Sequence, residues 1–401
     1  MTERGQYLLP ALALLLAACS VAPQTPEPRP TVEEAEIPGS ATRDADAPVR
    51  TEPEAARLPD DARAELRFTL AAVGDMMLGT DYPDDRLPDD DAVGFLAAVT
   101  EPLLAADLAF GNLEGVLVDG GEPAKQCSNP HACYLFRSPT RYAERFRAAG
   151  FDALSLANNH ALDFGEEGRG SSMEALSSAG IVHSGREGDF GALRLGDLSV
   201  GFVAFSVTRD SNLLHDYALA RSIVSDQAAL HDLLVVSFHG GAEGDDAARI
   251  PFGEEEYFGE PRGDVVRFAR EMVEAGADFV FGHGPHLVRG MERYGDRLIV
   301  YSLGNFATYY GISVSGDKGV APILLVTIDG YGRFLEGRVI SAVQLRPGGP
   351  QPDPQGRALQ QMRELSFADF REPGLRFLDD GRVLPDARHY VRPTAAPRSE
   401  R

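Results

Sequence analysis

The sequence predicts an α/β fold, and three observations carry that prediction. From about residue 67 onward, apolar segments of strand length alternate with segments of helical length. Three of the helical segments end in Ala-Gly and lead directly into the next apolar segment, at Gly150, Gly180 and Gly276. A hydrophobic content of 43% over 401 residues is normal for a globular core. Such alternation is typical of layered folds with parallel strand pairing.

The first 19 residues are predicted to form a lipoprotein signal peptide. Arg4 precedes an apolar run over residues 8–16, which is too short to span a bilayer. The run ends in Leu-Ala-Ala-Cys, which resembles a bacterial lipobox, so we expect Cys19 to carry a lipid. The protein would then be exported and anchored to the cell envelope by lipid alone, at the outer membrane if the organism has one. An ordinary signal peptide with an incidental cysteine is the alternative.

A solvated tether is predicted to follow the anchor. Residues 20–65 contain eight prolines and no aromatic residue, and such a composition cannot bury a core. We therefore expect a disordered tether there. The formal net charge of −23 argues against nucleic acid or an anionic membrane surface as a direct partner. Lysine occurs only at Lys125 and Lys318, so arginine supplies nearly all the positive charge.

The folded domain is predicted to span residues 66–346. Its expected strands cover residues 68–73, 107–110, 151–156, 200–206, 233–238, 278–281 and 298–302, and its expected helices cover 139–149, 166–179 and 264–275. Strands over 322–328 and 338–345 follow one another without a clear helix and are expected to pair antiparallel. Residues 347–401 turn rich in Pro and Gly and are expected to be a loosely structured extension, with a short helix over 359–365.

Two cysteines remain after Cys19. Cys127 and Cys133 lie in one short loop, and an exported domain meets oxidising conditions, so we predict a disulfide between them. A metal site is the alternative, but with only His131 between the two cysteines it would have too few ligands.

Polar residues follow five of the predicted strands directly. In open α/β sheets, ligands bind outside the carboxyl ends of the strands, so these residues are expected to meet at one place. Carboxylate, amide and imidazole groups without thiolate suit Zn, Mn, Fe or Mg. We therefore predict a site for one or two divalent metal ions, built from the residues after these strands: Asp75, Asn112, Glu114, Asn159, His160, His239, Glu243, His283 and His286.

The motifs that contain these residues resemble those of the CapA family, named for poly-γ-glutamate capsule synthesis, in the metallo-dependent phosphatase-like (calcineurin-like) superfamily. The resemblance covers about residues 67–310. It rests on Gly74-Asp75-Met76-Met77, Gly111-Asn112-Leu113-Glu114, the run from Asn158 to Gly165, His239-Gly240-Gly241-Ala242-Glu243, Gly282-His283-Gly284-Pro285-His286 and Tyr301-Ser302-Leu303-Gly304-Asn305-Phe306. It implies a metallophosphatase-like layered β-sandwich flanked by helices.

The resemblance also implies roles for single residues. The metal ligands would be Asp75, Glu114, Asn159, His239, His283 and His286. His160 would be the general acid that protonates a leaving oxygen, and Asp163 would orient it. Asn112, Glu243 and Asn305 are predicted to contact substrate. For Glu243, a contact that supports His239 and a plain loop acid are equal alternatives. For Asn305 the alternative is a turn cap.

The chain departs from the superfamily pattern at four positions. The bridging carboxylate, Glu114, falls in a Gly-Asn-Leu-Glu motif rather than in Gly-Asp. Met77 stands where metallophosphatases have the histidine of an Asp-x-His motif. Gly240 stands where the family usually has Trp, and Gly284 where it has a second His.

Two further sets of charged residues are not assigned to the metal site: two arginines near the motifs, and several short acidic runs. Arg169 and Arg289 are interpreted as solvated surface arginines, with contact to an anionic substrate as the alternative. Acidic runs such as residues 254–256 are interpreted as solvated faces.

The favoured function is that of a surface lipoprotein involved in capsule or exopolymer biosynthesis or processing, of the poly-γ-glutamate type. It would hydrolyse a cell-envelope polymer or its precursor with metal-activated water. Capsule synthase or export membrane proteins are the expected partners. One alternative is a non-catalytic assembly or tethering subunit of a capsule export machine. Another is a phosphoesterase on small phosphorylated substrates.

Overall fold

The computed structural model describes residues 60–125 and 134–388. The predicted signal peptide with Cys19, most of the predicted tether and the Cys127–Cys133 pair lie outside the described residues. Those expectations therefore stay predictions.

The larger of two main sheets has nine strands. Its parallel part joins β1, β2, β5 and β6, and β16 continues the sheet antiparallel to β1. Because these four parallel strands end beside one another, the residues that follow them share one edge of the sheet. In order, the strands are β20 (Leu375–Phe377), β21 (Arg382–Pro385), β17 (Phe334–Ile340), β16 (Ile323–Ile328), β1 (Phe68–Met77), β2 (Leu108–Leu113), β5 (Ala153–Ser155) and β6 (Val182–Ser184), with β15 (Asn305–Thr308) also paired to β1.

The second main sheet has six strands, and its four central strands are parallel. In order they are β13 (Met291–Tyr294), β14 (Arg297–Val300), β12 (Phe279–His283), β9 (Leu233–His239), β8 (Leu198–Ser206) and β7 (Gly191–Leu195). Three two-stranded pairs complete the described strands: β3 (Val116–Leu117) with β4 (Arg137–Ser138), β10 (Glu255–Tyr257) with β11 (Glu260–Gly263), and β18 (Ala342–Gln344) with β19 (Pro350–Pro352).

The two main sheets pack face to face. Alternate side chains of β2, such as Leu108 and Phe110, join one buried cluster with side chains of the second sheet. The Phe110 ring lies 5.4 Å from that of Phe202 on β8 and 6.2 Å from that of Phe281 on β12. The predicted layered sandwich is thus confirmed.

Helices cover both outer faces of the sandwich. Helices α2 (Thr100–Ala105), α3 (Ala143–Ala149) and α4 (Gly165–Ser178) bury apolar side chains against the larger sheet. Helices α5 (Tyr217–Leu230) and α6 (Val265–Ala275) do so against the second sheet. Short 3-10 turns lie at Ala97–Val99, Thr140–Tyr142 and Gly316–Gly319. None of the helices within the described ranges is long and apolar enough to cross a membrane.

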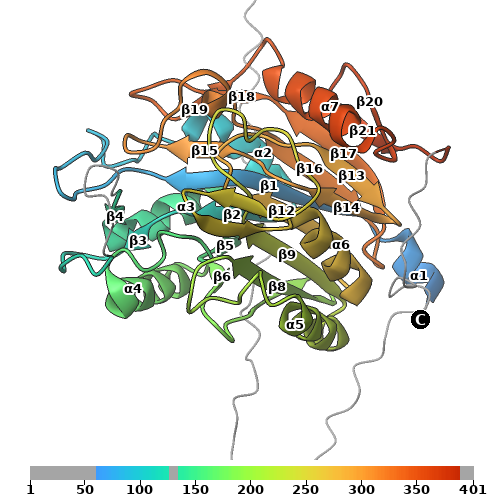
Figure 1. Ribbon diagram of the computed structural model, residues 1–401, viewed down its shortest axis with the longest axis horizontal. Helices are drawn as coiled ribbons and strands as arrows, with labels where there is room; N and C mark the ends of the chain where they lie inside the picture. The colour runs from blue at the N-terminus through green and yellow to red at the C-terminus, as the bar shows by residue number, and fades with distance from the viewer. Residues whose placement is uncertain (1–59, 126–133, 389–401) are drawn as a thin grey trace, which may run out of the picture. The chain divides into compact units, whose positions relative to one another are not determined.

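Both predicted boundaries of the domain are wrong. Residues 60–65, assigned to the tether, form α1 (Asp60–Glu65), whose Arg63 bonds the Gly330 carbonyl oxygen and Asp232. The predicted loose extension contains β19 and α7 (Arg357–Phe370) and ends in β20 and β21 of the larger sheet. Leu359 and Met362 of α7 belong to the buried cluster between the sheets. Helix α7 itself contacts β13 and β17 (Figure 1). Burial of these apolar side chains gives the extension a fixed structure.

The central elements follow the prediction closely. The antiparallel pairing of the two late strands is confirmed in β16 and β17. Asp264 caps α6 by accepting a hydrogen bond from the Arg267 amide. Ser138 does not cap the helix after it, because its hydroxyl donates to the Gly79 carbonyl oxygen instead.

Candidate metal centre

Four of the predicted metal ligands come from strand ends of both sheets. Asp75 lies near the end of β1 and Glu114 directly follows β2, while His239 and His283 end β9 and β12. The two histidines are register partners in the parallel β9–β12 pair. All four side chains are fully buried. Because β1 and β12 contact each other across the sandwich, ligands from the two sheets meet.

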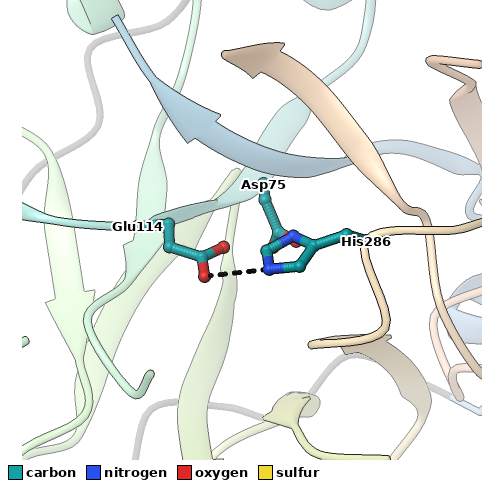
Figure 2. A group of neighbouring side chains, drawn as sticks. All are labelled: Asp75, Glu114 and His286. Atoms are coloured by element: carbon teal, nitrogen blue, oxygen red, sulfur yellow. Dashed lines mark ion pairs between the residues drawn. The ribbon is translucent and has the colours of Figure 1, made fainter. Parts of the chain in front are cut away.

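His286 closes the cluster from the loop after β12. Its Nδ1 atom lies 3.2 Å from Asp75 Oδ2, and its Nε2 atom lies 3.6 Å from Glu114 Oε1. Figure 2 shows the three side chains pointing toward one another. Each of Asp75, Glu114 and His286 offers one ligand atom, and these atoms all lie within 4.8 Å of one another. Three converging ligands of this kind could hold one cation.

Two further histidines border this triad. His239 Nε2 lies 3.5 Å from Glu114 Oε1, and His283 Nδ1 lies 3.1 Å from Asp75 Oδ1. The structure thus brings five of the six predicted metal ligands together. The sixth, Asn159, precedes His160, and its Oδ1 atom is buried.

The ligand atoms of this cluster lack hydrogen-bond partners within the described part of the chain. These atoms are Asp75 Oδ2, both carboxylate oxygens of Glu114, both ring nitrogens of His239 and of His283, and Asn159 Oδ1. The short approach of His283 to Asp75 does not have hydrogen-bond geometry. Nearly all buried polar atoms in folded proteins are bonded, and unpaired buried charges are costly. A bound divalent cation would satisfy these atoms together, so the residues fit such an ion.

The charges within the cluster shift the pKa values of its members. Burial and the charge of Asp75 raise the pKa of Glu114 to about 7. Burial acts to lower the pKa of His286, but the charge of Glu114 and the contact with Asp75 outweigh it and raise that pKa to about 10. Burial lowers the pKa of His239 to about 3, so this ring is held neutral, the form that binds metal. Burial opposes the ionisation of Asp75, but His283 and His286 hold its pKa well below the usual value.

These shifts predict a pH-dependent metal affinity. Protons compete with metal for Glu114 and His286, whose pKa values are both raised, so metal should bind more tightly as pH rises from 6 to 8.5. In metal-free protein, rising pH lowers stability through Glu114. Its contribution to the free energy of unfolding is fully present below pH 4.5 and is lost as pH rises through 7. The increase in Tm caused by Mn²⁺ should therefore grow with pH. An increase that is flat or shrinks over this range would contradict the expectation.

Two predicted substrate contacts hold metal ligands instead. The Asn112 side-chain amide is fully buried, and its Nδ2 donates to Asp75 Oδ1 at 2.9 Å. Asn305, the register partner of Asp75 on β15, places its Oδ1 2.9 Å from His286 Nδ1 and donates to two backbone carbonyl oxygens. These contacts assign both residues to positioning the ligands rather than to substrate.

Asn158 is a functional residue that the sequence did not single out. Its Nδ2 donates to Asn112 Oδ1 at 3.1 Å and to the Leu113 carbonyl oxygen at 2.8 Å, so it supports both the amide behind Asp75 and the strand before Glu114. Its Oδ1 accepts from the His160 backbone amide. Its position in the Asn-Asn-His run could have pointed to a role at the site. Residue type alone, however, does not show whether Asn158 or Asn159 supports the ligands.

The predicted acid and its orienting carboxylate are in contact. His160 Nδ1 lies 2.7 Å from Asp163 Oδ2, and the ring packs on Phe136 with 4.3 Å between ring centroids. Asp163 is fully buried, and its Oδ2 also accepts from the Phe136 backbone amide. Bonding at Nδ1 leaves His160 Nε2 as the nitrogen that can exchange a proton. The His160 backbone amide donates to Asn158, which bonds the Asn112 side chain behind Asp75, so His160 is tied to the ligand cluster.

Met77, which departs from the superfamily pattern, is not part of the ligand cluster. Its side chain is buried with Phe136 and Ile312, and its sulfur accepts a bond from the Gly79 amide. Since Phe136 also packs on His160, Met77 supports an apolar wall behind the predicted acid. At this position, Met77 therefore packs in the core instead of providing a metal ligand.

Glycine at 284 is required by the backbone. Gly284 has φ +115°, and an added Cβ would lie 2.7 Å from the Gly240 carbonyl oxygen. The Gly240 amide in turn donates to the His283 carbonyl oxygen. This close approach brings His239 and His283 side by side, so Gly240 and Gly284 are structural adaptations of the site. The second histidine is supplied two residues later by His286.

Gly284→Ala is expected to destabilise the fold by about 1–3 kcal/mol and to weaken metal binding, because it strains the backbone and separates the two loops. Gly244→Ala is the matched control, since Gly244 also has φ +115° but nothing lies within 4 Å of its added Cβ. Denaturant unfolding and metal titration of both variants measure the difference. Equal metal affinities in the two variants would contradict this role for Gly284.

Two arginines and one residue of an acidic run are not solvated as predicted, while Glu254 and Glu256 of that run are exposed. Arg289 is fully buried and forms two bonds with Glu255, at 2.9 and 2.7 Å, while its Nε donates to the Ala247 carbonyl oxygen. Arg169 is also buried and donates to Glu166 and to the Asp210 carbonyl oxygen. The interpretation of these arginines and of Glu255 as solvated is therefore wrong.

Glu243 is held beside the cluster by a third buried arginine. Arg262 donates to Glu243 Oε1 at 2.9 Å and to the Gly241 carbonyl oxygen. The other carboxylate oxygen of Glu243 lies 3.9 Å from His286 Nε2. Glu243 therefore lies next to the ligands, where it can orient His286 or contact a bound molecule.

Comparison with known proteins identifies the family. Residues 69–310 match the family described as bacterial capsule synthesis protein PGA_cap. The chain belongs to this family. The match includes Asp75, Glu114, His239, His283 and His286, and so the whole cluster described above.

Relatives of this PGA_cap protein are about a quarter identical to it over the aligned residues. "Uncharacterized protein y4sH" of Sinorhizobium fredii is 26% identical, over 60% of this chain and 66% of its own length. "Capsule biosynthesis protein CapA" of Bacillus anthracis is 27% identical, over 65% of each chain. "PGA biosynthesis protein CapA" of Bacillus subtilis is 24% identical, over 75% of this chain and 78% of its own length. The chain thus spans slightly less than two thirds of the first two relatives.

Among solved structures, a 5'-nucleotidase precursor from Thermus thermophilus aligns with a TM-score of 0.37 at 16% identity. The alignment covers 75% of this chain and 59% of that one. This similarity is too weak to bear on function.

Proposed function

We propose that this protein is a metal-dependent hydrolase that acts on a cell-envelope polymer of the poly-γ-glutamate type, or on its precursor. The observation that carries the proposal is the set of buried carboxylate and imidazole atoms around Asp75, Glu114 and His286 that have no hydrogen-bond partner in the described part of the chain. Membership of a capsule synthesis family supports the choice of polymer.

The residues of the chain divide into ligands, supports and a proton donor. The metal would be held by Asp75, Glu114, His239, His283 and His286. Asn159, in the segment after β5, is a further candidate ligand. A divalent ion bound there would supply a Lewis acid and activate water. His160, held at Nδ1 by Asp163, would give a proton from Nε2 to the leaving group. The buried Phe136 ring fixes the plane of the imidazole.

A substrate panel tests the proposal. Purified protein loaded with Mn²⁺ or Zn²⁺ is incubated with poly-γ-glutamate, a γ-glutamyl oligomer and aryl and nucleotide phosphoesters, with chelator-treated protein as control. We expect metal-dependent shortening of the glutamate polymer. Turnover of the phosphoesters alone would favour a phosphoesterase. No turnover of any substrate by metal-loaded protein would contradict hydrolysis and favour an assembly or tethering subunit.

We further propose that the protein is exported and anchored through a lipid on Cys19, and that it works beside capsule synthase or export membrane proteins. The apolar run before Cys19 and the proline-rich segment after it support this placement. Cell fractionation of wild type and Cys19→Ala tests it. Wild-type protein is expected with the membranes, and the variant is expected to leave them. Wild type in the soluble fraction would contradict anchoring.

A further inference from the structure

The chain has only two lysines among 38 lysine and arginine residues, and each contacts a residue that borders the metal centre, Asn159 or Asn305. Lys125 contacts the segment that carries Asn159 and His160. Lys318 contacts the side of the site formed by Asn305 and His286. The neighbouring arginines Arg262 and Arg289 are buried and bonded to carboxylates, so they are not available to a ligand.

Lys125 is fixed beside the predicted acid. Its Nζ lies 3.1 Å from the Asn159 carbonyl oxygen and 3.1 Å from Asp163 Oδ1, and its backbone amide donates to the Asp163 carbonyl oxygen. The side chain keeps 29% of its surface exposed. One face of the ammonium therefore bonds the protein while the rest can meet a ligand, since an ammonium has three donors.

Lys318 is fixed on the other side by its backbone. Its carbonyl oxygen accepts a bond from Asn305 Nδ2, and Asn305 Oδ1 contacts His286. Among the residues that the structure describes, its ammonium pairs only with the largely exposed Asp245, at 2.7 Å, and 25% of the side chain is exposed. An exposed pair of this kind is weak and exchanges readily for another anion.

The partner of the Lys318 ammonium lies in the same loop as Glu243. Lys318 Nζ pairs with Asp245, which follows Glu243 by two residues in the chain. The Glu243 carboxylate lies 3.9 Å from His286 Nε2. The loop that begins after His239 therefore joins the Lys318 side chain to the surroundings of the metal centre.

We propose that Lys125 and Lys318 form a cationic rim that binds carboxylate groups repeated along the substrate chain, one lysine on each side of the metal centre. Lysine presents a point charge without the fork that grips one phosphate, so two separate lysines suit two separate carboxylates. In a chain with net charge −23, two local cations also offset the repulsion of an anionic polymer. This rim deepens the proposed function and rests on the same site.

Equilibrium binding tests the rim without requiring turnover. The anisotropy of a fluorescent γ-glutamate oligomer is measured against full-length, metal-loaded protein. Lys125→Met and Lys318→Met should each weaken binding about two- to fivefold, and together by about tenfold. Lys125→Arg and Lys318→Arg should restore most of the affinity. The wild-type affinity should fall with added salt, as expected of exposed charges.

Three controls make the result decisive. Arg267→Met removes a positive charge from an exposed Arg267–Glu271 pair on α6 and should not change binding. The same oligomer with its free carboxylates amidated should bind weakly and equally to wild type and variants. Metal content confirms that the site is intact. Unchanged affinity in the double variant would overturn the rim, and a lysine effect confined to aryl phosphate would show a phosphate site instead. Lysine-dependent binding without hydrolysis would preserve the rim and contradict only the proposed activity.

Discussion

Glu114→Gln is expected to abolish metal binding without destabilising the metal-free protein. The wild-type carboxylate is fully buried and lacks a hydrogen-bond partner among residues 60–125 and 134–388. Its pKa is raised from 4.5 to about 7 by burial and by Asp75. At pH 8 this shift corresponds to a cost on the order of 3 kcal/mol in the metal-free fold. A neutral side chain removes that cost and also removes a metal ligand. Thermal unfolding with and without Mn²⁺ measures both effects.

Glu292→Gln is the matched control. Glu292 is equally buried, but Arg270 donates two bonds to it at 2.8 Å and the Tyr301 hydroxyl donates a third at 2.7 Å. Breaking this buried pair should destabilise the fold by about 3–5 kcal/mol, while metal still raises Tm. The two variants should therefore show opposite patterns. A strongly destabilised, metal-free Glu114→Gln protein would mean that Glu114 serves the fold alone.

His160→Gln is expected to lower kcat by about 10²- to 10⁴-fold on any substrate the protein hydrolyses, with metal content unchanged. The glutamine removes the proton donor but leaves the ligand cluster in place. The effect should be largest for substrates with poor leaving groups, because these depend most on protonation. Steady-state kinetics and elemental analysis of the same preparation measure the two quantities.

His183→Gln provides the comparison for His160. His183 also pairs with an aspartate, with Nδ1 3.0 Å from Asp189 Oδ2, but it bonds Ser177 at the surface and lies outside the metal cluster. Its replacement should leave kcat within about twofold of wild type, the range expected for surface substitutions. Equal losses in both variants would indicate a stability effect rather than proton transfer.

The sequence contained enough to place the ligand cluster. Strand ends followed by Asp75, Glu114, His239 and His283 predicted a shared position, because parallel strands deliver their carboxyl ends to one edge. Glycines at residues 150, 180 and 276 marked the ends of helices before the next strand, and so indicated the alternation of helices and strands. The C-terminal boundary was missed because α7 has few apolar side chains. These side chains are buried only through contacts with β13 and β17, which are distant in sequence.

The sequence could not predict which partners the buried polar side chains contact. Asn112 and Asn305 were assigned to substrate by residue type, yet both turn their amides toward metal ligands. The Arg289–Glu255 pair joins residues 34 positions apart, and nothing local in either segment indicates the other. Met77 and Gly284 looked like lost ligands because a motif shows which residue is missing but not that His286 can reach the same place.

Metal content is the most direct test of the central claim that the buried cluster holds a divalent ion. Wild type, Asp75→Ala and His239→Ala are purified without chelator, supplied with Mn²⁺, Zn²⁺, Fe²⁺ and Mg²⁺, and measured by elemental analysis after removal of free metal. We expect one or two equivalents of a divalent metal in wild type and a loss of at least one equivalent in each variant. Wild type without stoichiometric metal, or variants with the same content as wild type, would contradict the account.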